Sequence, residues 1–204
     1  MSNEKHEQEG GGNESRDIEE KPEREPKPIP RIYAASLSDY NAGRLHGTWI
    51  DADQDADDLA SDIQTMLDES PTPFAEEWAI HDYEGFGPLR LREYEDLVTI
   101  SRLGLGITEH GMAFAHWASV ASTDRDELER FEDVYLGHAD TVEAYAEQLL
   151  DELGYPQILE EALPDHMQPY VTLDVEGFAR DLELSGDITT SDGDGGVYVF
   201  DPGR

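Results

Sequence analysis

The chain has 204 residues, with 48 acidic and 14 basic side chains, a formal net charge of -34 and no cysteine. This composition excludes disulfides, thiolate metal sites and a cysteine nucleophile. It also excludes nucleic acid and anionic membranes as direct ligands, because both require basic patches. The acidity favours a basic protein partner, and the lack of an apolar signal segment or membrane span predicts a cytoplasmic protein.

The first 30 residues differ in composition from the rest. They contain all three lysines and are rich in Glu, Gly and Pro, with almost no apolar side chains. Such a segment cannot bury enough surface to offset the entropy of ordering, so we predict a disordered tail over residues 1–30. From residue 31 onward there are nine arginines and 39 acidic residues, a formal charge of -30.

Residues 31–90 are predicted to form a small antiparallel sheet with one helix. Three segments alternate or cluster apolar residues as strands do. They cover residues 32–35, 46–51 and 77–83. The helix is expected over residues 55–67, where Leu59, Ile63, Met66 and Leu67 form one apolar stripe.

Residues 91–136 are predicted to be a helical middle domain. Three segments carry apolar residues at helical spacing. They cover residues 92–103, 107–120 and 124–135. Gly104 and Gly106 are expected to separate the first two helices, and Thr123 is a candidate N-cap of the third.

Residues 137–204 are predicted to form a C-terminal unit of helices and one β-hairpin. The main helix is expected over residues 141–153, ended by Gly154. Two short helices follow at 158–163 and 175–184, and strands at 188–191 and 197–200 flank a Gly-rich and Asp-rich turn. The expected fold class is therefore α+β, an elongated chain of three small domains behind a disordered tail.

Acidic residues recur three or four positions apart on the predicted helices. Side chains at that spacing lie about 5–6 Å apart, and duplex DNA carries one charge per about 1.7 Å of axis. A ladder of carboxylates can therefore resemble a ladder of phosphates, and a charge of -30 equals that of about 15 base pairs. The candidate partner-binding residues are Asp55, Asp58, Asp62, Asp126, Glu129, Asp133, Asp140, Glu143, Glu147, Asp151, Glu176, Asp181 and Glu183.

The acidity also has a simpler explanation, because acidic, lysine-poor surfaces keep proteins soluble in strong salt. Composition alone favours neither interpretation. The alternative function is a salt-adapted acidic adaptor that binds another basic protein.

Discrete chemical sites are poorly supported. The Asp51-x-Asp53-x-Asp55 run resembles the start of a calcium loop, but Ala56 stands where glycine is needed and Asp62 where glutamate is expected. The histidines His110 and His116 are six residues apart, which does not align them on a helix for a metal. We therefore expect no metal, no cofactor and no catalytic residue.

Several segments resemble the ArdA family of antirestriction proteins. They are residues 33–43 with 46–49, the Trp78–Glu84 segment, and most of residues 145–187. In the last, Phe178-Ala179-Arg180-Asp181 stands where the family has Tyr-Gly-Arg-Asp. Arg180 is the one arginine of this region, and we expect an ion pair or a dimer contact for it.

The resemblance spans about residues 31–200 and carries functional implications. It implies an elongated, three-domain homodimer that mimics bent B-form DNA. It implies an inhibitor of type I restriction-modification enzymes that protects incoming mobile-element DNA and has no enzymatic activity. Residues 143–154 correspond to the family's antirestriction motif.

Overall fold

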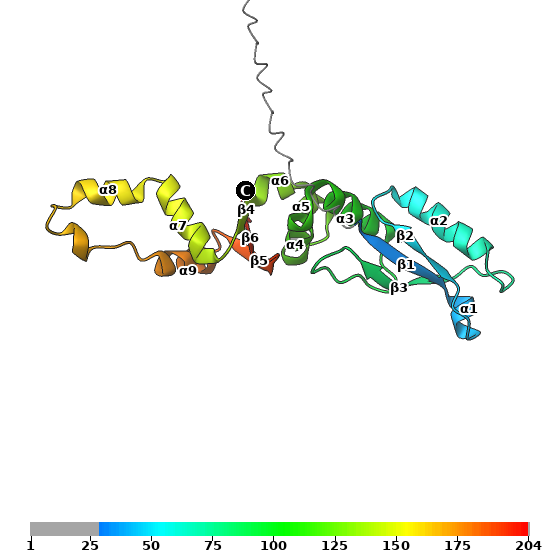
Figure 1. Cartoon of the computed structure of the whole chain (residues 1–204). Helices are drawn as coiled ribbons and strands as arrows, with labels where there is room; N and C mark the ends of the chain where they lie inside the picture. Colours follow the sequence, from blue (N-terminus) through cyan, green and yellow to red (C-terminus); the bar gives the residue numbers. More distant parts are fainter. Residues whose placement is uncertain (1–28, 204) are drawn as a thin grey trace, which may run out of the picture.

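The computed structural model describes residues 29–203, which form a mixed α+β structure with two three-stranded antiparallel sheets (Figure 1). The predicted tail lies outside the described residues except for Ile29 and Pro30. Pro30 is fully buried, and its carbonyl accepts a hydrogen bond of 2.7 Å from the Ala52 amide. Pro30 is therefore part of the packed body.

The three strands predicted for the N-terminal part are confirmed, and they form the first sheet in the order β2-β1-β3. Their bounds are β1 Arg31–Ser36, β2 Gly47–Asp51 and β3 Trp78–Glu84. The predicted helix is also confirmed as α2 (Ala56–Asp68), and its whole predicted apolar stripe is buried. Helix α2 packs on β1 and β2 because that stripe covers the apolar face of the sheet.

A short helix, α1 (Leu37–Asn41), was not predicted between β1 and β2. The Ser36 hydroxyl accepts a hydrogen bond of 3.3 Å from the Asp39 amide and so caps its first turn. A turn follows α1 directly, and its Gly43 has a φ of 75°, a conformation that favours glycine.

The predicted helix break at Gly104 and Gly106 is wrong. Helix α3 (Leu97–His110) runs through both glycines, and the chain breaks instead at Gly111, whose φ is 78°, before α4 (Met112–Val120). A Cβ on Gly104 would collide with the backbone of Ala52, and one on Gly106 with the Phe114 ring. Both glycines thus permit close packing of α3, which outweighs their low helix propensity.

The predicted third helix is also divided differently. It consists of α5 (Arg125–Glu129) and α6 (Phe131–Val134), and Asp124, not Thr123, is the N-cap residue. The chain then enters a strand that was not predicted, β4 (Tyr135–Ala139). Arg130 separates the two helices, so Leu128, Phe131 and Val134 reach the core from two short elements.

The next segment, residues 140–187, is named the C-terminal lobe. It contains α7 (Val142–Glu152), α8 (Tyr155–Ala162), the 3-10 helix η1 (Gln168–Tyr170) and α9 (Val175–Ser185). These elements lie at the opposite end of the molecule from the first sheet in Figure 1. The predicted end of α7 is confirmed, because Gly154 follows its C-cap with a φ of 74°.

The second sheet has the order β4-β6-β5 and separates two apolar clusters. Its hairpin, predicted from the Gly-rich turn, consists of β5 (Thr189–Gly193) and β6 (Gly196–Phe200). Side chains alternate along β6. Tyr198 and Phe200 join the main cluster, which also contains buried residues from 32 to 134, whereas Val197 and Val199 join a small cluster with α7 and α9.

Candidate acidic binding surface

All thirteen acidic residues predicted to contact a partner are exposed to solvent. They lie on and just before α2, on α5 and α6, and in the C-terminal lobe. Among the described residues, one of the thirteen forms an ion pair, Glu129 with Arg125 at 2.5 Å. The other twelve form no ion pair with a cation from the described part of the chain.

The C-terminal lobe is the most acidic part of this surface, with 13 acidic residues and one arginine. The side chains of Glu143, Glu147 and Asp151 follow one another at intervals of four on α7, as predicted, and Asp140 precedes the N-cap residue. Thr141 starts the helix by accepting a hydrogen bond of 3.1 Å from the Ala144 amide.

Local hydrogen bonds keep the first carboxylate of this ladder charged. Bonds from its own backbone amide and from the Thr141 hydroxyl lower the pKa of Glu143, and they outweigh the small effect of burial. The capping residue of α7 thus also favours the ionised form of a proposed binding group.

Helix α9 carries the second set of lobe carboxylates. Asp174 caps the helix by accepting a hydrogen bond of 2.9 Å from the Gly177 amide. Glu176, Asp181 and Glu183 are exposed, and Glu183 accepts a bond of 2.7 Å from the Thr190 hydroxyl on β5. This bond fixes the end of α9 to the second sheet.

Arg180 does not form the expected buried ion pair. It is exposed on α9 and makes no ion pair with any described residue. Its neighbour Asp181 is adjacent in sequence, and adjacent residues on a helix do not face each other, so the two side chains do not pair. The alternative expectation for Arg180, a contact with another molecule, stays a prediction.

Helix α2 presents a shorter ladder along the solvent-exposed edge of its buried stripe. Asp58 and Asp62 are four residues apart and exposed, and Asp55 is the N-cap residue without a side-chain capping bond. The Asp62 carboxylate accepts a hydrogen bond of 2.9 Å from the Gln54 amide. The sequence prediction for this helix is therefore confirmed in placement and exposure, while its binding role stays a prediction.

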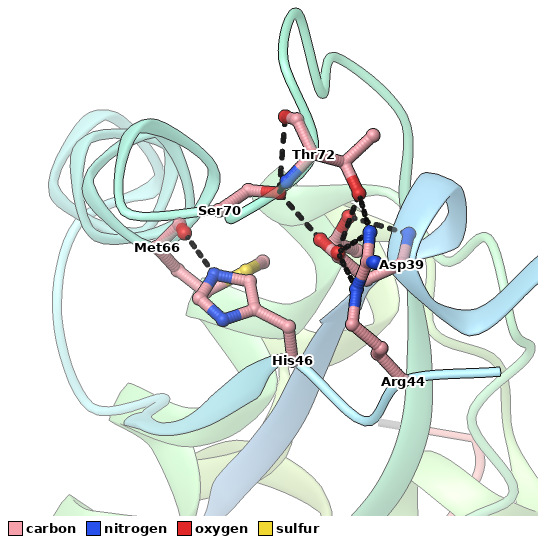
Figure 2. Close-up of polar contacts among 7 residues, drawn as sticks. Asp39, Arg44, His46, Met66, Ser70 and Thr72 are labelled. Atoms are coloured by element: carbon pink, nitrogen blue, oxygen red, sulfur yellow. Dashed lines mark hydrogen bonds and ion pairs between the residues drawn. The ribbon is translucent and has the colours of Figure 1, made fainter. Parts of the chain in front are cut away.

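A buried polar network holds the chain after α2 in place, and sequence reasoning missed it. Asp39 is fully buried on α1. Its carboxylate accepts hydrogen bonds of 2.5 Å from the Ser70 hydroxyl, 2.6 Å from the Thr72 hydroxyl and 3.2 Å from the Arg44 Nε (Figure 2). Because Ser70 and Thr72 follow α2 directly, the network ties the end of the acidic helix to α1.

The same network determines the ionisation of Asp39. Burial raises its pKa, but the hydrogen bonds from Ser70, Thr72, Ser36 and Arg44 together outweigh burial and hold the pKa well below its ordinary value. Asp39 is thus ionised at neutral pH, has a structural role and is not part of the exposed surface. One signal in the sequence was the cluster of short hydroxyl side chains at positions 70 and 72.

A second contact fastens α2 nearby. The His46 Nε2 atom lies 2.7 Å from the Met66 carbonyl oxygen, as Figure 2 also shows. Since Met66 is in the last turn of α2 and His46 precedes β2, this contact joins the helix to the sheet.

The third predicted ladder is not continuous. Asp126 and Glu129 lie on α5, whereas Asp133 lies on α6 beyond the break at Arg130. The continuous helix expected over residues 124–135 would have aligned the three. All three are exposed, but only Asp126 and Glu129 share a helix.

His116 and His110, the two histidines weighed above as metal ligands, instead make packing and hydrogen-bond contacts within the fold. The His116 Nδ1 atom lies 2.7 Å from the Ser191 hydroxyl, and its ring packs on Tyr198 with centroids 4.4 Å apart. Burial lowers the pKa of His116 against the opposing field of Asp194. His110 packs against the rings of Phe114 and Phe131. Within residues 29–203, no three potential ligands lie close enough together to hold a metal ion.

Comparison with known proteins places the chain in a family. A family model described as "Antirestriction protein (ArdA)" matches residues 32–196, a range that contains all thirteen predicted acidic residues. A search of curated proteins found no match. No helix in the described part of the chain is long and apolar enough to cross a membrane. Because the match covers most of the sequence, the chain belongs to the ArdA family of antirestriction proteins, which are non-enzymatic inhibitors of type I restriction-modification.

Proposed function

We propose that the chain inhibits type I restriction-modification enzymes by occupying their DNA-binding groove as an acidic mimic of duplex DNA. The observation that supports this most strongly is the uncompensated charge, because twelve of the thirteen predicted carboxylates have no ion-pair partner among the described residues. A groove built to bind phosphates would attract such a surface over long distances. Inhibition of this kind protects incoming mobile-element DNA without any chemical step.

The spacing of the carboxylates supports the same mechanism. On α7, Glu143, Glu147 and Asp151 stand one turn apart, which corresponds to about 5–6 Å between neighbouring side chains. Phosphates on one DNA strand rise about 3.4 Å per nucleotide along the axis. Each helical ladder therefore presents about 60% of the charge density of one DNA strand.

We also propose the three-domain division at residues 31–90, 91–136 and 137–204, and a homodimer. The exposed side of α9 supports a dimer contact, because Arg180 has no ion pair in the described part of the chain and Leu184, four residues on, is 78% exposed. Arg180 of one copy can meet Glu176 or Glu183 of another. Sedimentation equilibrium of the chain and of Arg180→Glu tests this, and a monomeric wild type contradicts it.

Competition with DNA is the experiment that tests the mimicry. A type I enzyme is bound to a labelled target duplex, and the protein is titrated in at several fixed salt concentrations. We expect the protein to displace the duplex, with an affinity that falls steeply as salt rises, because charge contacts are screened. Displacement that is independent of salt contradicts the proposal.

The same titration separates mimicry from adaptation to strong salt. If the acidity serves only solubility, the folded protein leaves the duplex bound at every concentration, and its free energy of unfolding rises strongly with salt. If the proposal holds, displacement occurs while the protein stays folded at low salt.

A further inference from the structure

The C-terminal lobe contains an apolar groove that DNA mimicry does not require. Its volume is about 360 Å³, within the range of about 300–1,000 Å³ usual for ligand sites. Leu150 of α7, Leu159 of α8 and Val171 after η1 are among the apolar side chains that line it. This cavity is named the lobe groove.

The elements around the lobe groove leave much of their apolar surface uncovered. Helix α8 and η1 are wholly described, and neither buries a side chain. Tyr170 of η1 is 81% exposed and Tyr155 of α8 is 46% exposed. Apolar surface of this extent beside a cavity is typical of a protein interaction site.

Carboxylates border the lobe groove. Glu147 and Asp151 of α7 and Glu160 of α8 line it together with the apolar side chains, and no basic side chain does so in the described part of the chain. The groove therefore combines an apolar floor with a negatively charged edge. This chemistry matches a helix that has leucine-like residues on one face and lysine or arginine beside them.

We propose that the lobe groove binds a basic amphipathic helix of the protein that the chain inhibits. Apolar side chains of that helix enter the groove, and its basic side chains meet Glu147, Asp151 and Glu160. The inference rests on the proposed function for the identity of the partner, since Glu147 and Asp151 belong to both surfaces. It adds a contact that a DNA duplex cannot make, and therefore a source of selectivity among enzymes.

Charge argues against a second copy of this chain as the occupant. The lobe has 13 acidic residues and one arginine, so a second lobe seated in the groove would place like charges together. Arg180, the one arginine, lies on α9 and does not line the groove. A basic partner meets no such repulsion.

Two helical peptides test the proposal on the full chain. One carries leucines at helical spacing of three and four with lysines beside them, and the other has glutamine in place of every leucine at the same charge. We expect the leucine peptide to bind about tenfold more tightly, or better, because one buried leucine accounts for such a factor. In amide NMR spectra, its binding shifts the signals of Leu150, Leu159 and Val171.

Matched variants on α8 locate the site. Leu159→Gln removes a groove-lining side chain without changing charge, and Ile158→Gln changes an exposed neighbour outside the lining. We expect Leu159→Gln to weaken the leucine peptide about tenfold and the glutamine peptide hardly at all, and Ile158→Gln to change neither. The helical circular dichroism signal shows whether each variant folds. If Leu159→Gln does not fold, the NMR shifts of the wild-type chain show whether the leucine peptide binds in the lobe groove.

Equal binding of both peptides, or NMR shifts confined to the sheets, overturns the proposal. Loss of self-association instead of peptide binding in Leu159→Gln identifies a second copy as the occupant and also overturns it. The DNA competition described above stays a separate measurement. Peptide binding without displacement of DNA contradicts only the proposed DNA mimicry. Displacement of DNA without leucine-dependent peptide binding contradicts only the proposal for the lobe groove.

Discussion

Neutralising part of the C-terminal lobe should weaken inhibition in a graded manner. The variant combines Glu147→Gln, Asp151→Asn, Glu176→Gln and Asp181→Asn, which are all exposed and without ion pairs among the described residues. The charge of the lobe changes from -12 to -8, counting 13 acidic residues and Arg180. At about 0.5 kcal/mol for each exposed charge contact, the loss is about 2 kcal/mol, or about 30-fold in affinity.

Folding stability should move in the opposite direction. Glu147 and Asp151 are four residues apart on α7, and a like-charge pair at that spacing costs about 0.2–0.5 kcal/mol. Removing the pair should therefore raise the free energy of unfolding slightly. Weaker inhibition by a more stable protein identifies these carboxylates as binding groups and not as structural ones.

The assay is displacement of labelled DNA from a type I enzyme, with urea unfolding measured in parallel. A control variant changes Glu69, Glu76, Glu77 and Glu93 to Gln, which removes the same number of exposed charges outside the predicted surface. We expect a loss of less than about threefold for the control, because its charges are not predicted to make contacts of this strength. Equal losses in both variants refute a localised surface, and complete loss from one single substitution indicates a discrete site.

Three further predictions concern the fold. Gly104→Ala should lower the free energy of unfolding by about 1–2 kcal/mol, because overpacking against Ala52 exceeds the gain in helix propensity. The control Ser61→Ala, at an exposed position, should change the free energy of unfolding measured in urea by less than about 0.5 kcal/mol. Leu59→Ala should cost about 2–5 kcal/mol in the same measurement, because Leu59 is fully buried; a smaller loss refutes its core position. The depressed pKa of Asp39 should stabilise the fold fully above the ordinary carboxyl pKa of about 3.9, with loss as the pH falls toward the folded value. Asp39→Asn should remove that part of the acid dependence in a pH series of thermal unfolding, and an unchanged profile contradicts it.

Elements with a clear period could be predicted from the sequence. The stripe of α2 repeats at three and four residues, and all four of its members are buried. The three strands of the first sheet and the C-terminal hairpin were likewise predicted from alternation and turn residues. These patterns are local, because the periodicity of one element indicates which of its faces is buried.

Features that depend on contacts far along the chain could not be predicted. Gly104 is read locally as a helix breaker, and only its packing on Ala52 explains why α3 continues through it. Asp39 is read as one more surface acid, yet partners 31 and 33 residues away bury it in a network. The exposure of the thirteen carboxylates was predictable because charged side chains stay in water, but the break at Arg130 between two of their helices was not.

The two faces of β6 pack into apolar clusters of very different size, so the two ends of the molecule should differ in their free energy of local opening. Tyr198 and Phe200 are anchored in the large cluster, whereas the buried part of the other cluster consists of Ile188, Val197 and Val199. Segments with few buried apolar contacts open locally at a lower free energy than a large core does. Amide hydrogen exchange should therefore be fastest in the lobe. We predict that this local opening lets the charged end of the inhibitor adjust to DNA-binding channels of different widths.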